Sequence, residues 1–342
     1  MQMTTSTERD RRLERAFFLG GQLTFENSEY RRAFQGIVGA LLESDAGAGD
    51  LTAKSLDLAD RPRRASIVAR AAGIAAGLQE IGALLEGSGL QVSFEKSDGE
   101  PIQPDDVLLR AEGDESKLLS FERIGLNLLQ RMSGIATAGR CLQQRFSGRS
   151  SARVVGTRKT PWGWLDKRAL HVAGCGTHRL GLGDAILIKN NHLALVAARE
   201  EDAAPIAVER AWKHREESAF IEVEVRSEAS ARAAAQVFRK LRREAGEDYP
   251  CLIMLDNMTP GGAADVVRML RSEGLWEDAL IEVSGGVCEA TIEAYAASGV
   301  DAISVGALTH SPRALDISQK IHDLNSSSLG NQGDQSSCPV QR

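Results

Sequence analysis

From about residue 150 onward, short apolar runs alternate with longer segments that have the pattern of helices, and this alternation constrains the fold most. The runs contain four to six residues, and most are rich in valine, isoleucine or leucine: 152–155, 185–188, 220–225, 251–255, 280–283 and 302–305. Between them lie helix-like stretches such as 194–214, 228–245, 261–272 and 289–297. This alternation is typical of βαβ units and a parallel sheet. Six units are too many for a small open sheet, so we expect a barrel or partial barrel.

Polar and charged residues lie within these runs or directly after them. In chain order they are Arg158 and Lys159; Lys189, Asn190 and Asn191; Glu222 and Glu224; Asp256 and Asn257; Ser284, Gly285 and Gly286; and Gly306 and Ala307. Active sites of α/β barrels form at the carboxyl ends of the strands. The sequence therefore predicts a single site at that end of the sheet.

Positive charge is concentrated in one window of an acidic chain. From Thr157 to Lys189 there are six lysines and arginines and two histidines but only two aspartates, which gives about +4, whereas the whole protein carries −6. A positive pocket in an acidic protein predicts a multiply charged anionic ligand. Arg158, Arg179 and Lys189 are the kinds of side chain that bind carboxylates or phosphates. The alternatives are a solvated helix face for the cations and a core position for His178.

A glycine turn follows the fifth run. Ser284, Gly285 and Gly286 present backbone N–H groups at the start of a helix, and glycine lets a phosphate approach the backbone. Gly306 and Ala307 follow the next run, and paired phosphate sites after the last two strands are typical of barrels. The alternative is that these residues only form turns.

Acidic residues lie on two neighbouring runs. Glu222 and Glu224 are two positions apart on one expected strand, so both side chains face the same side. Two buried carboxylates need a cation, and with Asp256 they make a site for Mg²⁺ or a ribose. The alternative is a structural ion pair with the nearby arginines and lysines. A metal site at His178 and His192 lacks a matching third ligand.

The first 130 residues have a different pattern. We expect an apolar, alanine- and glycine-rich helix over 66–86, β-like runs over 92–110 and an amphipathic helix over 118–132 that carries Arg123. An N-terminal α/β sandwich domain ahead of the barrel follows from these elements. The expected domains are 10–133 for the sandwich and 134–308 for the barrel, with a C-terminal helix at 309–324 that returns to the N-terminal domain.

Composition narrows the cellular setting. No stretch approaches the roughly 18 apolar residues of a membrane helix, and the polar start of the chain lacks the apolar core of a signal peptide. Five scattered cysteines without a CxxC pair favour a reduced, cytoplasmic setting. The acidic balance argues against a nucleic-acid partner. Both polar ends, 1–9 and 325–342, are expected to be disordered.

Taken together, these segments resemble the quinolinate phosphoribosyltransferases, which are type II phosphoribosyltransferases. The resemblance covers about residues 40–315 and rests on GAGDLT (47–52), FERIGLNLLQRMSGIAT (121–137), GTRKT (156–160), THRLGLGDAILIKNNH (177–192), IEVEV (221–225), IMLDN (253–257), VSGGV (283–287) and VGALTHS (305–311). It implies an N-terminal α/β sandwich and an incomplete, open α/β barrel of parallel strands, which agrees with the strand count.

The resemblance implies that quinolinate and phosphoribosyl pyrophosphate give nicotinate mononucleotide, CO₂ and pyrophosphate with Mg²⁺, in de novo NAD biosynthesis. It assigns the two quinolinate carboxylates to Arg158, His178, Arg179 and Lys189, and to Arg123 from the partner subunit of a homodimer. The implied catalytic set is Lys159, which contacts the donor, with Lys189, Glu224 and Asp256. Glu224 and Asp256 would bind the ribose or magnesium pyrophosphate, and Ser284, Gly285, Gly286, Gly306 and Ala307 the phosphate.

The chain departs from the family pattern in four places. The usual TRKT-x-PGLR stretch continues as TPWGWL at 160–165, about two residues shorter, and the glycine run at 173–176 reads AGCG. Arg226 replaces an acidic or small residue, and Asn190 replaces an aspartate. These changes leave open which pyridine acid fits. The alternatives are a related type II transferase that acts on another base, such as the molybdenum-gene-cluster relative, and a catalytically inactive regulator that binds a pyridine acid or nucleotide. The sequence does not predict whether the oligomer is larger than a dimer.

Overall fold

The computed structural model describes residues 7–56 and 61–323. The tail expected to be disordered, 325–342, lies outside these residues, as does most of the N-terminal segment 1–9. Thr7 to Arg9 correct that expectation, because they begin helix α1 (Glu8–Phe17). The Thr7 side chain accepts from the Asp10 backbone N–H, and the Asp10 side chain accepts from that of Thr7. This reciprocal cap satisfies two N–H groups that have no partner within the helix.

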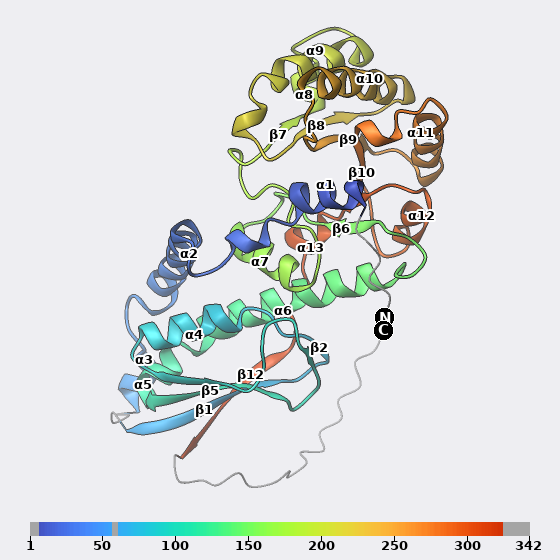
Figure 1. Ribbon diagram of the computed structural model, residues 1–342. Helices are drawn as coiled ribbons and strands as arrows, with labels where there is room; N and C mark the ends of the chain where they lie inside the picture. Colours follow the sequence, from blue (N-terminus) through green and yellow to red (C-terminus); the bar gives the residue numbers. More distant parts are fainter. Residues whose placement is uncertain (1–6, 57–60, 324–342) are drawn as a thin grey trace.

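A six-stranded parallel sheet forms the core of the larger part of the molecule (Figure 1). In spatial order its strands are β6 (Arg153–Val155), β11 (Ala302–Ser304), β10 (Leu280–Ser284), β9 (Cys251–Asp256), β8 (Ile221–Val225) and β7 (Ile186–Ile188). All six coincide with predicted apolar runs. The two edge strands, β6 and β7, do not pair with each other within the described part of the chain. The expected incomplete α/β barrel is therefore confirmed.

Helices connect the strands and cover the outside of this sheet (Figure 1). They are α7 (Trp164–Val172), α8 (Asn190–Leu193), α9 (Glu200–Trp212), α10 (Glu228–Ala245), α11 (Pro260–Ser272), α12 (Ile292–Ala297) and α13 (Ala307–His310). Helix α10 shows how the sequence sets such an element. Ser227 caps its start, and Gly246 ends it in the left-handed conformation. Ala231, Ala234 and Phe238 form the buried stripe at helical spacing.

Helix α1 closes the amino-terminal end of the barrel. Leu13, Ala16 and Phe17 are buried against residues near the starts of the strands, namely Phe220, Leu252, Leu280 and Ala302. Arg9 fixes the helix there, because its Nε and Nη2 donate to the two oxygens of Asp301 at 2.6 and 2.5 Å. The predicted N-terminal domain began at residue 10, but this helix packs on the barrel instead.

The N-terminal region is built on a four-stranded antiparallel sheet. In spatial order its strands are β12 (Ile317–Asp323), β1 (Pro62–Ala69), β5 (Val107–Asp114) and β3 (Gln91–Phe94), while β2 (Gly73–Ile74) pairs with β4 (Pro101–Ile102). The helices are α2 (Ser28–Ala46), α3 (Leu51–Ser55), α4 (Leu78–Gly87), α5 (Glu115–Ser120) and α6 (Glu122–Gln144). Ile81 of α4 and Leu129 of α6 share a buried cluster with Ile67 and Leu109 of the sheet. Helices on a sheet confirm the α/β sandwich.

Helix α6 joins the two parts of the molecule and runs through the predicted boundary between residues 133 and 134 (Figure 1). At its end, Gln143 donates to the Ala152 carbonyl (3.1 Å) and accepts from the Val154 N–H (2.8 Å), which ties the helix to β6. Neither α6 nor any other helix in the described residues is long and apolar enough to cross a membrane.

Two predicted helices are wrong in whole or in part. Segment 66–86 contains the second half of β1, all of β2 and nearly all of α4, which starts only after Gly77 turns the chain at φ +95°. Segment 309–324 does return to the N-terminal region, but as strand β12. This strand pairs antiparallel with β1, from Arg63 opposite Asp323 to Ala69 opposite Ile317.

Candidate active site

The carboxyl ends of all six parallel strands surround a cavity of about 440 Å³. Eight of the predicted site residues line it: Arg158, Lys159, His178, Arg179, Lys189, Glu224, Asp256 and Ser284. The predicted strand ends therefore do meet at a single site. Asn190, also expected at this end of the sheet, lines the cavity too. Sequence reasoning did not assign Thr157 or Ser304 to the lining, although Thr157 precedes Arg158 and Ser304 ends β11.

The predicted phosphate turns adjoin the cavity. Gly285 and Gly286 follow Ser284 with φ of +99° and +62°. A Cβ at Gly285 would lie 2.1 Å from Asn257 Oδ1, so only glycine lets this turn pass so close to the end of β9. Gly306 and Ala307 begin the short α13, and a Cβ at Gly306 would lie 3.4 Å from Lys159 Cδ. Their role in phosphate binding stays a prediction.

Arg123 lies apart from this cavity. It is exposed near the start of α6, where it lines a separate hollow with Asp45, Asp50 and Ser120. Its predicted role in the site of a partner subunit stays a prediction.

A buried ion pair anchors the loop that carries Lys159. Arg131 of α6 donates to both carboxylate oxygens of the fully buried Asp166, at 2.8 and 2.7 Å, and Thr160 donates to the same carboxylate. Thr309 donates to the Lys159 carbonyl at 2.8 Å. The backbone of Lys159 is therefore held from two sides, while its exposed side chain is free to reach a ligand.

The other cations converge on the cavity from separate elements. Arg179 is nearly buried, and its Nη1 donates to the Ala185 carbonyl at 3.1 Å. Burial, and then the charge of Arg158, lower the pKa of Arg179. Lys189 precedes α8, and His192 accepts from the Lys189 backbone N–H at 2.9 Å. Like charges that converge repel one another unless an anion lies between them. The part of the cavity lined by these cations is therefore suited to an anion.

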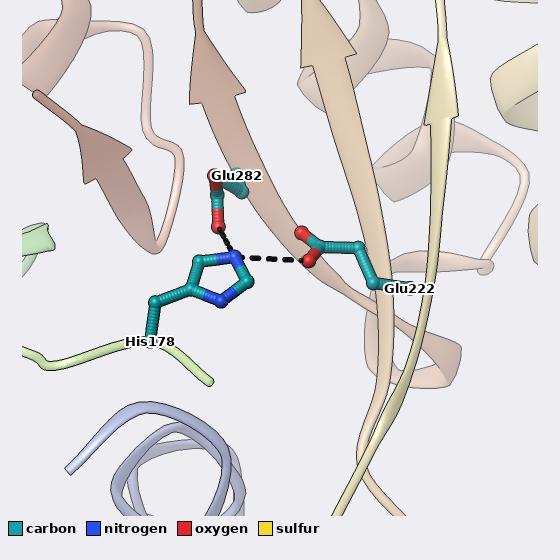
Figure 2. Close-up of side chains that lie close together, drawn as sticks. All are labelled: His178, Glu222 and Glu282. Atoms are coloured by element: carbon teal, nitrogen blue, oxygen red, sulfur yellow. Dashed lines mark ion pairs between the residues drawn. The ribbon is translucent and has the colours of Figure 1, made fainter. Parts of the chain in front are cut away.

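His178 forms a buried cluster with Glu222 and Glu282 inside the barrel (Figure 2). Its Nε2 lies 3.2 Å from Glu222 Oε2 and 3.6 Å from Glu282 Oε2. Its Nδ1 accepts from the Arg179 backbone N–H at 2.7 Å. Because Nδ1 accepts, Nε2 carries the proton of the neutral ring and faces the two glutamates, whose carboxyl oxygens have no hydrogen-bond partner among the described residues. One ring nitrogen is thus bonded to the backbone and the other lies between two carboxyl groups, and contact between His178 and a substrate carboxylate stays a prediction.

The same cluster has the separations of a metal site, since its three ligand atoms lie within 4.8 Å of one another. Burial raises the pKa of Glu222 and of Glu282 to about 8 and lowers the pKa of His178 to about 4. Without a bound cation, both carboxyl groups therefore keep their protons near neutral pH. The sequence analysis did not predict Glu282 as a site residue. It could have done so, because Glu282, like Glu222 in β8, is an acidic residue inside an otherwise apolar run.

Lys167 of α7 is a second buried group that the sequence did not reveal. Its ammonium donates to the Thr177 carbonyl, just before His178. Burial, and then the charge of Arg158, lower the pKa of Lys167 to about 7. The lysine therefore fixes the backbone of the segment that carries His178 and Arg179.

Glu224 and Asp256, at the carboxyl ends of the neighbouring strands β8 and β9, form an acidic wall of the cavity. Burial raises the pKa of Glu224, and the Asp256 carboxylate raises it further. Arg226 donates from Nε to Asp256 Oδ2 at 3.1 Å, and Asn257 donates from Nδ2 to Asp256 Oδ1 at 2.9 Å. Two carboxylates facing one space are the hard oxygen ligands that Mg²⁺ prefers, so the residues present fit that ion.

Comparison with known proteins identifies this arrangement. The model of the quinolinate phosphoribosyl transferase C-terminal domain matches residues 135–320, and that of the N-terminal domain matches 50–133. The chain belongs to the quinolinate phosphoribosyl transferase family. The two matches meet within α6, so the family's domain boundary falls inside one continuous helix.

Curated relatives in the family carry related names. A probable nicotinate-nucleotide pyrophosphorylase (carboxylating) of Methanothermobacter thermautotrophicus is 36% identical over 293 residues, covering 84% of this chain and 99% of the relative. A protein of the same name from Bacillus subtilis is 35% identical over 291 residues, covering 83% and 91%. The solved nicotinate-nucleotide pyrophosphorylase of Francisella tularensis superposes with a TM-score of 0.71 at 27% identity, covering 85% of this chain and 96% of that one. The NadC structure from Streptococcus pyogenes gives 0.71 at 29%, covering 85% and 98%.

This quinolinate phosphoribosyl transferase differs from the expected family pattern in stretches that border the cavity. Within the shortened stretch 160–165, Trp162 lies under the guanidinium of Arg131, 5.1 Å from the ring centre. The arginine that anchors the Lys159 loop is therefore covered by a tryptophan of that loop. Arg226, another departure, contacts Asp256 directly.

Proposed function

We propose that this chain transfers the phosphoribosyl group of phosphoribosyl pyrophosphate to quinolinate, forming nicotinate mononucleotide, CO₂ and pyrophosphate in de novo NAD biosynthesis. One observation carries the proposal. A single cavity is lined both by the cations Arg158, Arg179 and Lys189 and by the carboxyl groups of Glu224 and Asp256, in a family whose curated relatives are named for this activity.

The pyridine dicarboxylate would be bound by Arg158, Arg179 and Lys189. Arg179 is held rigidly by burial and by the Ala185 carbonyl, whereas Arg158 and Lys189 are exposed to the cavity. Charge-assisted contacts from these groups would fix the ring, with its nitrogen facing the donor. Fixing two reactants in this way removes much of the entropic part of the barrier.

The chain's other groups would stabilise the transfer itself. As the bond from ribose C1 to pyrophosphate breaks, Lys159 neutralises charge on the donor, and the ring nitrogen forms the new bond to C1. The nitrogen is then positively charged. The bond from the ring to the adjacent carboxylate breaks as CO₂ leaves, the electron pair stays on the ring carbon next to N⁺, and that carbon takes up a proton. The protein mainly positions the reactants and supplies charge.

Three further parts belong to this proposal. Mg²⁺ would be held by Glu224 and Asp256, and when bound it would neutralise the leaving pyrophosphate. A homodimer, alone or as the unit of a larger oligomer, would supply Arg123 from the partner subunit. The protein would act in the cytoplasm, as its cysteine content suggests.

A paired assay tests the proposed reaction. The protein is incubated with Mg²⁺ and phosphoribosyl pyrophosphate, and with either quinolinate or nicotinate, and mononucleotide and CO₂ are measured. We expect mononucleotide and equimolar CO₂ from quinolinate only. Mononucleotide from nicotinate alone would instead indicate a related transferase. Binding of quinolinate without turnover would indicate a regulator.

A further inference from the structure

Arg226 occupies an unusual position beside the acidic wall of the cavity. It directly follows β8, two residues after Glu224, and so projects toward the same side of the sheet. Its Nε donates to Asp256 Oδ2 at 3.1 Å, while its own backbone N–H donates to Glu200 Oε1 at 2.9 Å. The backbone is thus fixed at a point from which the side chain reaches the carboxylate.

Both carboxylate oxygens of Asp256 accept hydrogen bonds from within the chain. Arg226 takes one carboxylate oxygen, and the Asn257 amide takes the other at 2.9 Å. Asp256 is only 14% exposed at its side chain, whereas the Arg226 side chain is 54% exposed. The ion pair therefore has a sheltered member and an exposed one. A long, half-exposed arginine can leave its partner at low cost, because exposed ion pairs contribute little net energy.

We propose that Arg226 is an internal counter-ion that holds Asp256 in the donor-free protein and transfers to the pyrophosphate group of the donor when the donor arrives with its cation. The inference rests on the proposed function and adds a donor-binding residue to it. The planar guanidinium fork matches phosphate oxygens as well as it matches a carboxylate. Once Arg226 has moved, Asp256 Oδ2 is free to bind a cation, so cation and pyrophosphate bind cooperatively.

A purely structural ion pair between the ends of β8 and β9 makes different predictions. It would lower stability when removed and would leave the affinities for metal and pyrophosphate unchanged. The counter-ion requires two effects of opposite sign from one substitution. Arg226→Ala should strengthen binding of a divalent cation alone, because the competitor for Asp256 is gone. The same substitution should weaken binding of pyrophosphate, because a phosphate ligand is gone.

The experiment measures both affinities in the full-length protein. Mn²⁺ binding without donor is followed by the electron paramagnetic resonance signal of the free ion, and pyrophosphate binding in saturating Mg²⁺ by calorimetry. For Arg226→Ala we expect Mn²⁺ to bind about three- to fivefold more tightly and pyrophosphate about tenfold more weakly. The matched control is Arg268→Ala, which removes the same charge from an exposed pair with Asp265 on α11 and should change neither affinity.

A double substitution locates the effect. If Arg226 competes for Asp256, the gain in Mn²⁺ affinity on removing Arg226 should disappear in an Asp256→Asn background. Unchanged affinity for Mn²⁺ or for pyrophosphate in Arg226→Ala overturns the inference, as does a gain that persists without the Asp256 carboxylate. Failure of the proposed function would appear elsewhere, as absence of nicotinate mononucleotide with the unsubstituted protein. The inference is judged only by differences between the variants.

Discussion

Individual cations of the cavity differ in burial, and this difference sets what each can do. Arg179 and Lys167 are buried and donate to backbone carbonyls. They therefore fix the backbone around the site in addition to contributing positive charge. Arg158, Lys159 and Lys189 are exposed, so their charges are available to a ligand. Substitution of an exposed cation should therefore change binding with little effect on folding.

Arg158→Ala tests this distinction. We expect quinolinate to bind more weakly by about 2–4 kcal/mol, because a charge-assisted contact in a closed site is lost. The free energy of unfolding should stay close to that of the unsubstituted protein. Calorimetric titration with quinolinate and urea unfolding measure the two quantities. Wild-type affinity in Arg158→Ala would contradict the assignment.

The buried acids predict a pH dependence of stability. The pKa of Glu282 is raised to about 8 in the folded protein, so between its ordinary value of 4.5 and about 8 the folded state holds a proton that the unfolded state has lost. The contribution of this group to stability is therefore greatest below pH 4.5 and is lost as pH rises to 8. Glutamine cannot titrate, so Glu282→Gln should remove this loss.

The measurement is urea unfolding of both proteins at pH 5, 6.5 and 8. The stability of the wild type minus that of Glu282→Gln should fall with rising pH, on the order of 1 kcal/mol per pH unit. Glu273→Gln, at an exposed position after α11, provides the control. A difference between wild type and Glu282→Gln that is constant with pH would show that Glu282 is ionised throughout.

Single residues also show where sequence reasoning ends. The cations at the strand ends could be predicted because charge, glycine and strand position occur together in the chain. The clustering of His178 with Glu222 and Glu282 could not, because the two glutamates come from different strands. The contact between Arg226 and Asp256 is likewise formed by loops 30 residues apart.

Secondary-structure elements were predictable where the whole strand is buried, and not where it is largely exposed. The six parallel strands are buried on both sides and appear in the sequence as continuous apolar runs. Segment 66–86 misled because its alanines favour helix, whereas pairing of β1 with two neighbouring strands determines its actual conformation. Strand β12 was not predicted because its alternation of apolar and polar residues is weak. Its pairing partner, β1, also lies some 250 residues away in the sequence.

Strand β12 should be essential for the N-terminal sheet. It covers one edge of β1 over seven residue pairs, and its buried Ile317 belongs to the core cluster of that region. Ending the chain after Asp316 exposes a long strand edge, so we expect lower stability and aggregation. Ending it after Asp323 keeps the strand and should leave stability unchanged. Thermal unfolding and light scattering compare the two; equal behaviour would show that β12 adds nothing.

Helix α1 should be essential for the barrel. Phe17 is fully buried, and its ring lies against the rings of His178 and Phe220 at centroid distances of 4.9 and 5.5 Å. Phe17→Ala should cost about 3–5 kcal/mol of unfolding free energy and loosen the segment that carries Arg179. Leu195→Ala, at a side chain that is 88% exposed, should cost under about 0.5 kcal/mol. Denaturant titration distinguishes them, and a loss below about 1 kcal/mol for Phe17→Ala would contradict the role of α1.

For the whole molecule, the position of Arg123 bears on assembly. It is exposed on the N-terminal part of α6, outside the cavity of its own chain. The family resemblance assigns it to quinolinate binding. Both statements hold if two copies pack so that the start of α6 from one copy faces the cavity of the other. A closed two-fold dimer would then contain two shared sites.

Complementation between two inactive variants tests this arrangement, because a mixed dimer with shared sites would contain one intact site. Arg123→Ala and Lys189→Ala should each be nearly inactive alone. In a mixed dimer, one site collects both defects and the other collects neither. If subunits exchange at random, about half of the dimers are mixed, so about a quarter of all sites should recover. The two variants are unfolded, refolded together and assayed for nicotinate mononucleotide, with each variant refolded alone as the control. If a verified mixed dimer stays as inactive as its parents, Arg123 acts within its own chain or has no part in the reaction, and the shared site is wrong.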